Sequence, residues 1–390
     1  MTALQKVLIT GIIVAAVGAG IYEARQASRL RDQLQALQQQ QAPLADQLRQ
    51  LRQERDAALK RLAAASAKPA QRLPAPPVQV TAPPATPPEE LRSTNLFERF
   101  PDGVRLTAKQ VESYLKTHGR NAASLLAAYR TTRDPALLAE AVQKYPNEPL
   151  VALEAAYSKD ASPETQRQWL EAFKQSAPDN ALPHYLLARN YFKAGQTDLA
   201  VQELLAAAGK TQTQDFFVDR MSDNEEAYLA AGYSPAEAKA ISLQQLELMP
   251  NRGDLKQLSY DLVELAKSYQ RAGDDASARN ALQITAQLGQ RGQTSSPGQI
   301  AIDQFLGFAM ETLALNAMNP AAPYGDSGQT VRDRLNQLAQ QKAALQQLVL
   351  QSDALLKTLP DQDWITYADR VKTFGEAAAA RWILSKYGQK

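Results

Sequence analysis

Hydrophobic and polar positions divide this chain into an apolar run, a heptad-patterned helix, a proline-rich stretch and a long helical body. The apolar run covers residues 7–22, "VLITGIIVAAVGAGIY", after a short tail at residues 1–6. A membrane-spanning helix needs about 20 apolar residues and a signal-peptide core about 7 to 15, so its length lies between the two. The run continues into "EARQASRLRDQL" without a turn-forming residue. We therefore predict a transmembrane anchor, ahead of a signal cleaved after Gly18–Gly20 and of a buried soluble helix.

Residues 23–66 form a glutamine-rich segment with the spacing of a coiled coil. In this heptad pattern, the two a positions without an apolar residue hold Gln41 and Arg55. Pro43 is expected to kink or restart the helix. We predict a homodimer through this coil, and the alternative is a single amphipathic helix lying on the membrane or on the protein itself. The apolar heptad positions are Leu30, Leu34, Leu37, Leu44, Leu48, Leu51, Ala58 and Leu62.

Two arguments about membrane orientation disagree. Arg25, Arg29 and Arg31 follow the apolar run and outweigh Lys6, which by the positive-inside rule keeps the body in the cytoplasm. The segment 1–65, however, resembles a membrane-anchor and glutamine-rich coil module of some bacterial sigma-factor-associated proteins. That resemblance implies a single-pass protein of the bacterial inner membrane with its body in the periplasm. We slightly favour the periplasm and leave the cytoplasmic side open.

A proline-rich linker is predicted at residues 67–95. It contains "KPAQRLPAPPVQVTAPPATPPE", with eight prolines and no helical period. Such a segment favours extended polyproline II, which at about 3.1 Å per residue would separate body and coil by roughly 60 Å. A ligand for proline-binding domains is the sharper but less favoured interpretation.

Residues 96–390 are predicted to be an all-α body of short paired helices. Asp134, Ser162 and Ser234 each precede a proline, which is the pattern of a capped helix start. No run of useful length has the period of a strand. One long heptad-patterned helix at residues 330–359 is expected to pack along the body rather than to pair between subunits. Helix ends are predicted before Pro146, Pro178 and Pro250.

A repeated pattern organises this body. "LARNYFKAGQTDLAVQELL" begins at Leu187, and a similar stretch, "LAKSYQRAGDDASARNALQI", begins at Leu265. Both copies place small residues on facing helices around a glycine turn, which lets two helices pack closely. The pattern resembles the tetratricopeptide repeat over about residues 147–290 and 361–388, and implies an α-solenoid of helical hairpins. The third copy matches at Trp364, Tyr367, Ala368, Val371, Gly375, Ala380 and Leu384.

The repeat is not regular along the chain. The offset between Leu187 and Leu265 is no multiple of the repeat period of about 34, so residues 216–243, "FFVDRMSDNEEAYLAAGYSPAEAKAISL", are expected to be an insertion or an altered helix pair. "LVALEAAYSKDASPETQRQWLEAFKQSAPDN", just before the first good copy, is interpreted as a degenerate unit. A regular superhelix is therefore not expected.

Charge and candidate chemistry point away from an enzyme. The 43 basic and 41 acidic residues nearly balance, which does not support nucleic acid as the main partner, and the absence of cysteine removes thiolate chemistry. His118 and His184 lack further ligands at metal spacing. "GDSG" at 325–328 has no matching histidine context, and "GKT" at 209–211 has Leu204 where a phosphate-binding loop requires glycine. We predict no catalytic residue, no metal and no cofactor.

Four basic residues are the candidate ligand-binding positions. In tetratricopeptide relatives, the second and sixth residues after the repeat's leucine face the inner groove, and here these are Arg189, Lys193, Lys267 and Arg271. The resemblance implies that such pairs, spaced i and i+4, bind the carboxylates of an acidic peptide. The alternative is an ordinary solvated helix face.

Together these features predict a non-catalytic, membrane-tethered adaptor that binds a protein or acidic peptide through a helical groove. One alternative is a structural envelope protein that associates with itself. Another, which rests on the anchor module alone, is a regulator connected with sigma-factor signalling.

Overall fold

A computed structural model of the full chain describes residues 104–246, 249–293, 297–325 and 328–388. The predicted tail, anchor, coil and linker, and with them the predicted homodimer, lie outside the described residues. Within the described ranges there are fifteen helices and no strand, which confirms the all-α prediction for this part of the body. No helix found there combines the length and the apolar character that crossing a membrane requires.

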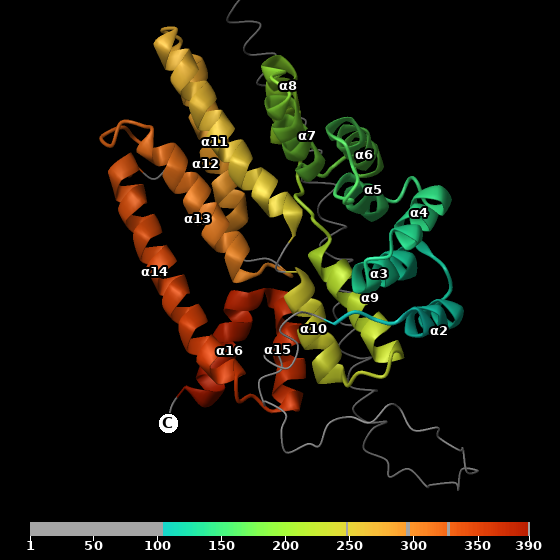
Figure 1. Cartoon of the computed structure of the whole chain (residues 1–390). Coiled ribbons are helices and arrows are strands. Elements are labelled where there is room, and N and C mark those ends of the chain that lie inside the picture. The colour runs from blue at the N-terminus through green and yellow to red at the C-terminus, as the bar shows by residue number, and fades with distance from the viewer. Residues whose placement is uncertain (1–103, 247–248, 294–296, 326–327, 389–390) are drawn as a thin grey trace, which may run out of the picture. The chain divides into compact units, whose positions relative to one another are not determined.

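Most of the helices follow one another through short turns, and a longer connection separates α13 from α14 (Figure 1). They are α2 (Ala108–His118), α3 (Ala122–Thr132), α4 (Pro135–Lys144), α5 (Pro149–Ala156), α6 (Pro163–Ser176), α7 (Leu182–Lys193), α8 (Thr197–Ala208), α9 (Phe217–Ala230), α10 (Pro235–Leu246), α11 (Pro250–Arg271), α12 (Asp275–Gln293), α13 (Ala301–Asn316), α14 (Val331–Leu356), α15 (Asp361–Phe374) and α16 (Glu376–Tyr387).

The predicted helix starts are confirmed by their capping contacts. The Asp134 carboxylate accepts a hydrogen bond from the backbone N–H of Ala136 at 3.0 Å, and Ser162 accepts one from Thr165 at 3.1 Å. These contacts satisfy N–H groups that have no partner within the helix. Pro250 separates two helices as expected, but it does so as the first residue of α11.

The helices pair as hairpins, and the hairpins pack against one another in an order that departs from the sequence. α7 packs against α8 and α11 against α12, while α7 also contacts α11 directly. The α9–α10 pair, which contains residues 216–243 except for Phe216, instead contacts α3 and α15. The body is thus a helical repeat-like structure in which an intervening helix pair packs elsewhere. This arrangement explains why the two best copies of the repeat are not consecutive in the sequence.

Small residues of the repeat let α7 approach its neighbours closely. Ala188, Ala200 and Ala207 are fully buried, in one cluster with Tyr185 and Leu258. The turn between α7 and α8 contains Gly195 at φ 73°, a left-handed conformation that glycine adopts without a steric penalty. The repeated positions are therefore packing and turn positions.

The third copy and the long heptad helix also pack into the body. Trp364 is completely buried, and its indole N–H donates to the carbonyl oxygen of Leu356 at 3.2 Å. Leu338 and Leu345 of α14 lie in one cluster with Phe308 of α13. The packing predicted for this helix along the body is confirmed by its contacts with α13 and α16.

α12 and α13 make an unusually close backbone contact at three glycines. A Cβ atom on Gly289 would lie 2.5 Å from the backbone nitrogen of Glu311 and 2.7 Å from the carbonyl oxygen of Gly307. A Cβ on Gly292 would lie 3.1 Å from the Cα of Gly307. Only residues without a side chain fit at Gly289 and Gly307, so the separation of these helices is set by glycine.

Candidate functional site

Arg189 lies between two helices that the repeat brings together. Its Nη1 atom donates to Asp261 Oδ2 at 3.1 Å, and each side chain is about one-fifth exposed. Burial raises the pKa of Asp261 above its ordinary value, although the Arg189 guanidinium opposes that shift. Arg189 therefore joins α7 to α11 through an ion pair that belongs to the body itself.

The packing register of α7 and α11 differs from their sequence alignment. Arg189 contacts Asp261, whereas its counterpart in the repeat is Lys267, six positions further along α11. Six residues of helix correspond to about 9 Å along the axis. Equivalent residues of the two copies are therefore displaced from one another along the helix axes. Arg189 does not lie beside Lys267, so the four predicted residues do not form one continuous site.

The other three predicted residues are exposed. Lys193 is in the last turn of α7 and has no ion pair with any described residue. Lys267 forms an ion pair with Glu264 at 2.7 Å, and Arg271 Nε donates to the carbonyl oxygen of Lys267 at 3.2 Å. Lys267 lowers the pKa of Glu264 below its ordinary value. These cations are accessible to a partner.

Tyr260 extends this exposed surface. Tyr260, Glu264, Lys267 and Arg271 are spaced i, i+4, i+7 and i+11, so they share one face of α11. The tyrosine is 44 % exposed although it is large and aromatic. We call this set, with Lys193, the α11 face.

A cavity of about 520 Å³ lies where the α8–α9 connection meets the start of α11, the end of α12 and the start of α13. Part of its wall is apolar. Arg252 of α11 binds Asp303 of α13 there, with its Nε atom 2.6 Å from Oδ1. The cavity thus combines apolar surface with charged groups at helix ends. Its apolar residues include Phe217, Leu255, Leu288, Leu306 and Met310.

Asp215, from the α8–α9 connection, also lines this space, which we call the Asp215 cavity. Its Oδ1 atom accepts a hydrogen bond from the backbone N–H of Phe217 at 3.1 Å. Burial and then the nearby Asp303 carboxylate raise the pKa of Asp215, while Arg252 and Arg220 oppose the shift. This carboxyl group therefore takes up a proton more readily than an exposed aspartate does.

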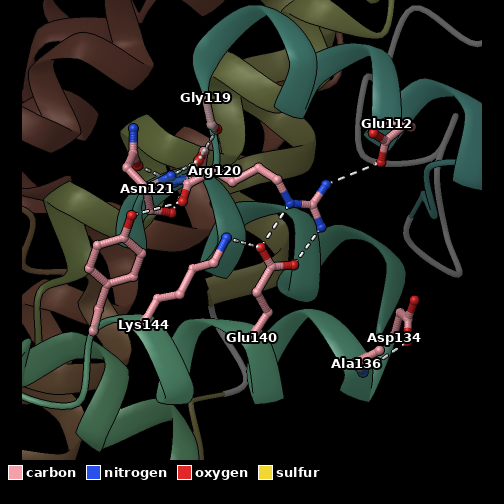
Figure 2. Close-up of polar contacts among 10 residues, drawn as sticks. Glu112, Gly119, Arg120, Asn121, Asp134, Ala136, Glu140 and Lys144 are labelled. Carbon is pink, nitrogen blue, oxygen red and sulfur yellow. Dashed lines mark hydrogen bonds and ion pairs between the residues drawn. The ribbon is translucent and has the colours of Figure 1, made fainter.

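A second cavity, of about 330 Å³, lies beside the Arg120 guanidinium. Figure 2 shows that Arg120 connects Glu112 of α2 with Glu140 of α4, and that Lys144 contacts the same Glu140 carboxylate. Hydrogen bonds from Arg120 and Lys144 lower the pKa of Glu140 to about 2. Because all these charges are paired, the cluster holds the first helices together and presents no free group to a ligand.

A buried ionic network joins α3, α5 and α9 in the interior. Arg130, 5 % exposed, donates to Asn224 Oδ1 at 2.8 Å, to Glu154 Oε1 at 3.1 Å and to Asp223 Oδ2 at 3.3 Å. Arg220 contacts the same Glu154 at 3.2 Å. The charged groups of this network are paired with one another, although Arg220 Nε has no hydrogen-bond partner among the described residues, and their role is structural.

The motifs considered for catalysis have ordinary structural surroundings where they are described. His184 is buried and lies 2.6 Å from Glu203, whereas His118 lies 3.1 Å from Glu226. Leu204 is buried in the core, and part of "GDSG" is outside the described ranges. No group of three metal-ligating side chains gathers among the described residues.

The Asp215 cavity and the exposure of Tyr260 were not among the features predicted from the sequence. The cavity exists because segments far apart in the sequence meet, which a local pattern does not record. Its only local signal is "LMPNRG", where a proline followed by polar residues marks the start of α11. Tyr260 had a clearer signal, since its spacing from Lys267 and Arg271 is helical.

Comparison with known proteins gives no match: no protein-family model, no curated protein and no solved structure is significantly similar to this chain.

Proposed function

We propose that this protein is a non-catalytic, membrane-tethered adaptor whose helical body binds an acidic segment of a protein partner on the α11 face. The observation that carries this proposal is the exposure of Tyr260, Lys267 and Arg271 on one side of α11, with Lys193 exposed at the end of the adjoining α7. Tyrosine and arginine are among the residue types that dominate binding energy at protein interfaces.

The charges of this face are available at little cost. The Lys267–Glu264 pair is more than half exposed on both sides, and exposed pairs of this kind contribute about 0–1 kcal/mol. A carboxylate of the partner can replace Glu264 without leaving a buried charge. Lys193 and Arg271 need no such exchange, because neither forms an ion pair with a described residue.

The tether and the coil complete the proposed mechanism. Residues 7–22 would hold the protein at the membrane, and the linker at 67–95 would let the body reach partners away from the surface. A dimer through residues 23–66 would present two α11 faces. Two faces raise the effective concentration for clustered partners without adding any new contact.

The test places a photo-cross-linking amino acid at position 260 of the full-length chain in its native membrane. We expect adducts with a partner whose cross-linked peptide is acidic. The charge reversal Lys267→Glu with Arg271→Glu should remove most of the adduct. The matched control is Lys109→Glu with Lys116→Glu, which makes the same charge change on the exposed side of α2.

Equal adduct yields from both double variants would refute the proposed face. An adduct made of two copies of this chain would instead support the self-associating alternative. Adducts with many unrelated proteins, insensitive to charge reversal, would also contradict a specific adaptor.

A further inference from the structure

The N-terminus of α11 lies at the Asp215 cavity without a cap. α11 has 22 residues, its N-cap Met249 supplies no side-chain hydrogen bond, and no acidic residue occupies its first turn. The other two helices that begin at the cavity differ. Asp215 accepts from the first backbone N–H of α9, and Asp303 accepts from the backbone N–H of Ile300 at the start of α13. Only the positive end of α11 is therefore left uncompensated among these three.

Asn251 provides an independent sign of a ligand at this helix end. It is the second residue of α11, it lines the cavity, and it is only 3 % exposed. Its side-chain amide has no hydrogen-bond partner among the described residues. The amide atoms of Asn251 keep some accessible surface in the cavity, so they are available to hydrogen-bond a group bound there.

Arg291 adds a cation to the same cavity. Its Nη1 atom donates to the hydroxyl of Tyr185 at 2.7 Å, and no described carboxylate lies within ion-pair distance of its guanidinium. Arg252, by contrast, is neutralised by Asp303. The guanidinium of Arg291 thus retains N–H donors for an anionic group.

We propose that this cavity binds a small amphiphilic carboxylic acid, with its carboxylate at the N-terminus of α11 between Asn251 and Arg291. Its apolar part would lie against Leu288, Leu306 and Met310, which line the same space. A volume of about 520 Å³ is in the range of small-molecule sites. This site is separate from the α11 face and does not depend on the adaptor function.

The surrounding charges also give the binding a pH dependence. Asp215 lines the cavity together with Asp219, Asp303, Arg252 and Arg291. Its pKa is raised by burial and by Asp303, and the cations Arg252 and Arg220 act in the opposite direction. While ionised, Asp215 repels a bound carboxylate. As pH falls through its pKa, that repulsion disappears, so the affinity for a carboxylate rises as long as the ligand itself stays ionised.

The proposal is tested by isothermal titration calorimetry of the full-length chain with naphthoate and phenylbutyrate, each compared with its neutral amide. We expect both carboxylates to bind and their amides to bind at least about tenfold more weakly. Arg291→Gln should weaken binding of the carboxylates roughly ten- to a hundredfold, since it removes a charged hydrogen bond. Arg279→Gln is the matched control, because Arg279 is an exposed arginine of the same helix outside the cavity.

Two further variants separate binding from damage to the fold. Asn251→Ala should weaken the carboxylates and leave the amides less affected. Asp215→Asn keeps a side-chain oxygen for the hydrogen bond from Phe217 but removes the charge, so it should strengthen carboxylate binding. A gain of affinity cannot come from unfolding.

Absence of carboxylate binding would overturn the proposal. So would equal binding of the amides, equal effects of Arg291→Gln and Arg279→Gln, or a loss of affinity in a folded Asp215→Asn variant.

Discussion

Gly289→Ala in α12 should destabilise the protein, whereas Gly→Ala at a helical position with free space around the new Cβ should stabilise it. In an exposed helix, Gly→Ala stabilises by about 0.8–1 kcal/mol, because glycine loses more backbone freedom on folding. Gly253 of α11 has no atom within 4 Å of an added Cβ, so Gly253→Ala should give this gain. Gly289 has no such space.

The magnitude at Gly289 follows from the distances. An added Cβ would lie 2.5 Å from one backbone atom and 2.7 Å from another, against about 3.5–4.0 Å for ordinary carbon contacts. α12 and α13 would have to separate by about 1 Å to restore ordinary contacts, which weakens the packing along both. Overpacking costs about 1–3 kcal/mol, and collision with backbone on two sides puts this site at or above the upper limit. After the helix-propensity gain, we expect Gly289→Ala to destabilise by about 2 kcal/mol.

Gly292 provides the intermediate case. Its nearest contact would be 3.1 Å, so a shift of a few tenths of an ångström suffices, and the cost is largely offset by the helix-propensity gain. Urea unfolding of the full-length chain, followed by far-UV circular dichroism, should rank the variants Gly253→Ala, Gly292→Ala and Gly289→Ala in falling midpoint at similar slope. If Gly289→Ala is as stable as Gly253→Ala, the backbone contact between α12 and α13 is not as close as described.

Further predictions concern the ionic clusters and a cap. Arg130→Ala should destabilise the body by about 3–5 kcal/mol in urea unfolding, since it leaves buried carboxylates around a vacated site, and a loss below about 1 kcal/mol would contradict the role given to the network. The pKa of Glu140 is lowered from 4.5 to about 2, so its contribution is complete above pH 4.5 and is lost as pH falls toward 2. Because the ion pairs of Arg120 are partly exposed, Glu140 contributes about 1 kcal/mol to stability. The stability difference between wild type and Glu140→Gln should therefore shrink as pH falls from 4.5 toward 2. A difference that does not change with pH would refute this prediction. Ser162→Ala should cost about 1 kcal/mol through loss of the α6 cap, measured by thermal unfolding against Ser385→Ala, whose hydroxyl makes only an exposed bond within its own helix.

Local patterns predicted the helices and their pairing because the signals are local. Asp134 and Ser162 each fix a helix start because the side chain accepts a backbone hydrogen bond and the proline that follows already has a helical φ. The buried alanines of the repeat predicted that α7 would pack closely on neighbouring helices. Each of these features needs only a few consecutive residues, and each is present in the structure.

Long-range register could not be predicted in the same way. The sequence near Arg189 does not show that this residue contacts Asp261 and not Lys267. The packing register of two helices depends on all the residues of their interface. The Asp215 cavity has the same origin, since the start of α11 faces it only when α12 and α13 are in place. The repeat pattern therefore identified three exposed cations, Lys193, Lys267 and Arg271, but neither their relative positions nor the ion pair of Arg189.

The placement of α9 and α10 has a consequence for how this body can change length. Open-ended repeat proteins gain or lose units by duplication or deletion, because each unit touches only its neighbours. Here the α9–α10 pair contacts α3 on one side of the sequence and α15 on the other. Removal of the last helix pair would uncover α10, near the middle of the chain, and an added pair would not reproduce that contact. Because the α9–α10 pair connects early helices with late ones, a deletion at the C-terminal end should destabilise the body far from the deleted residues.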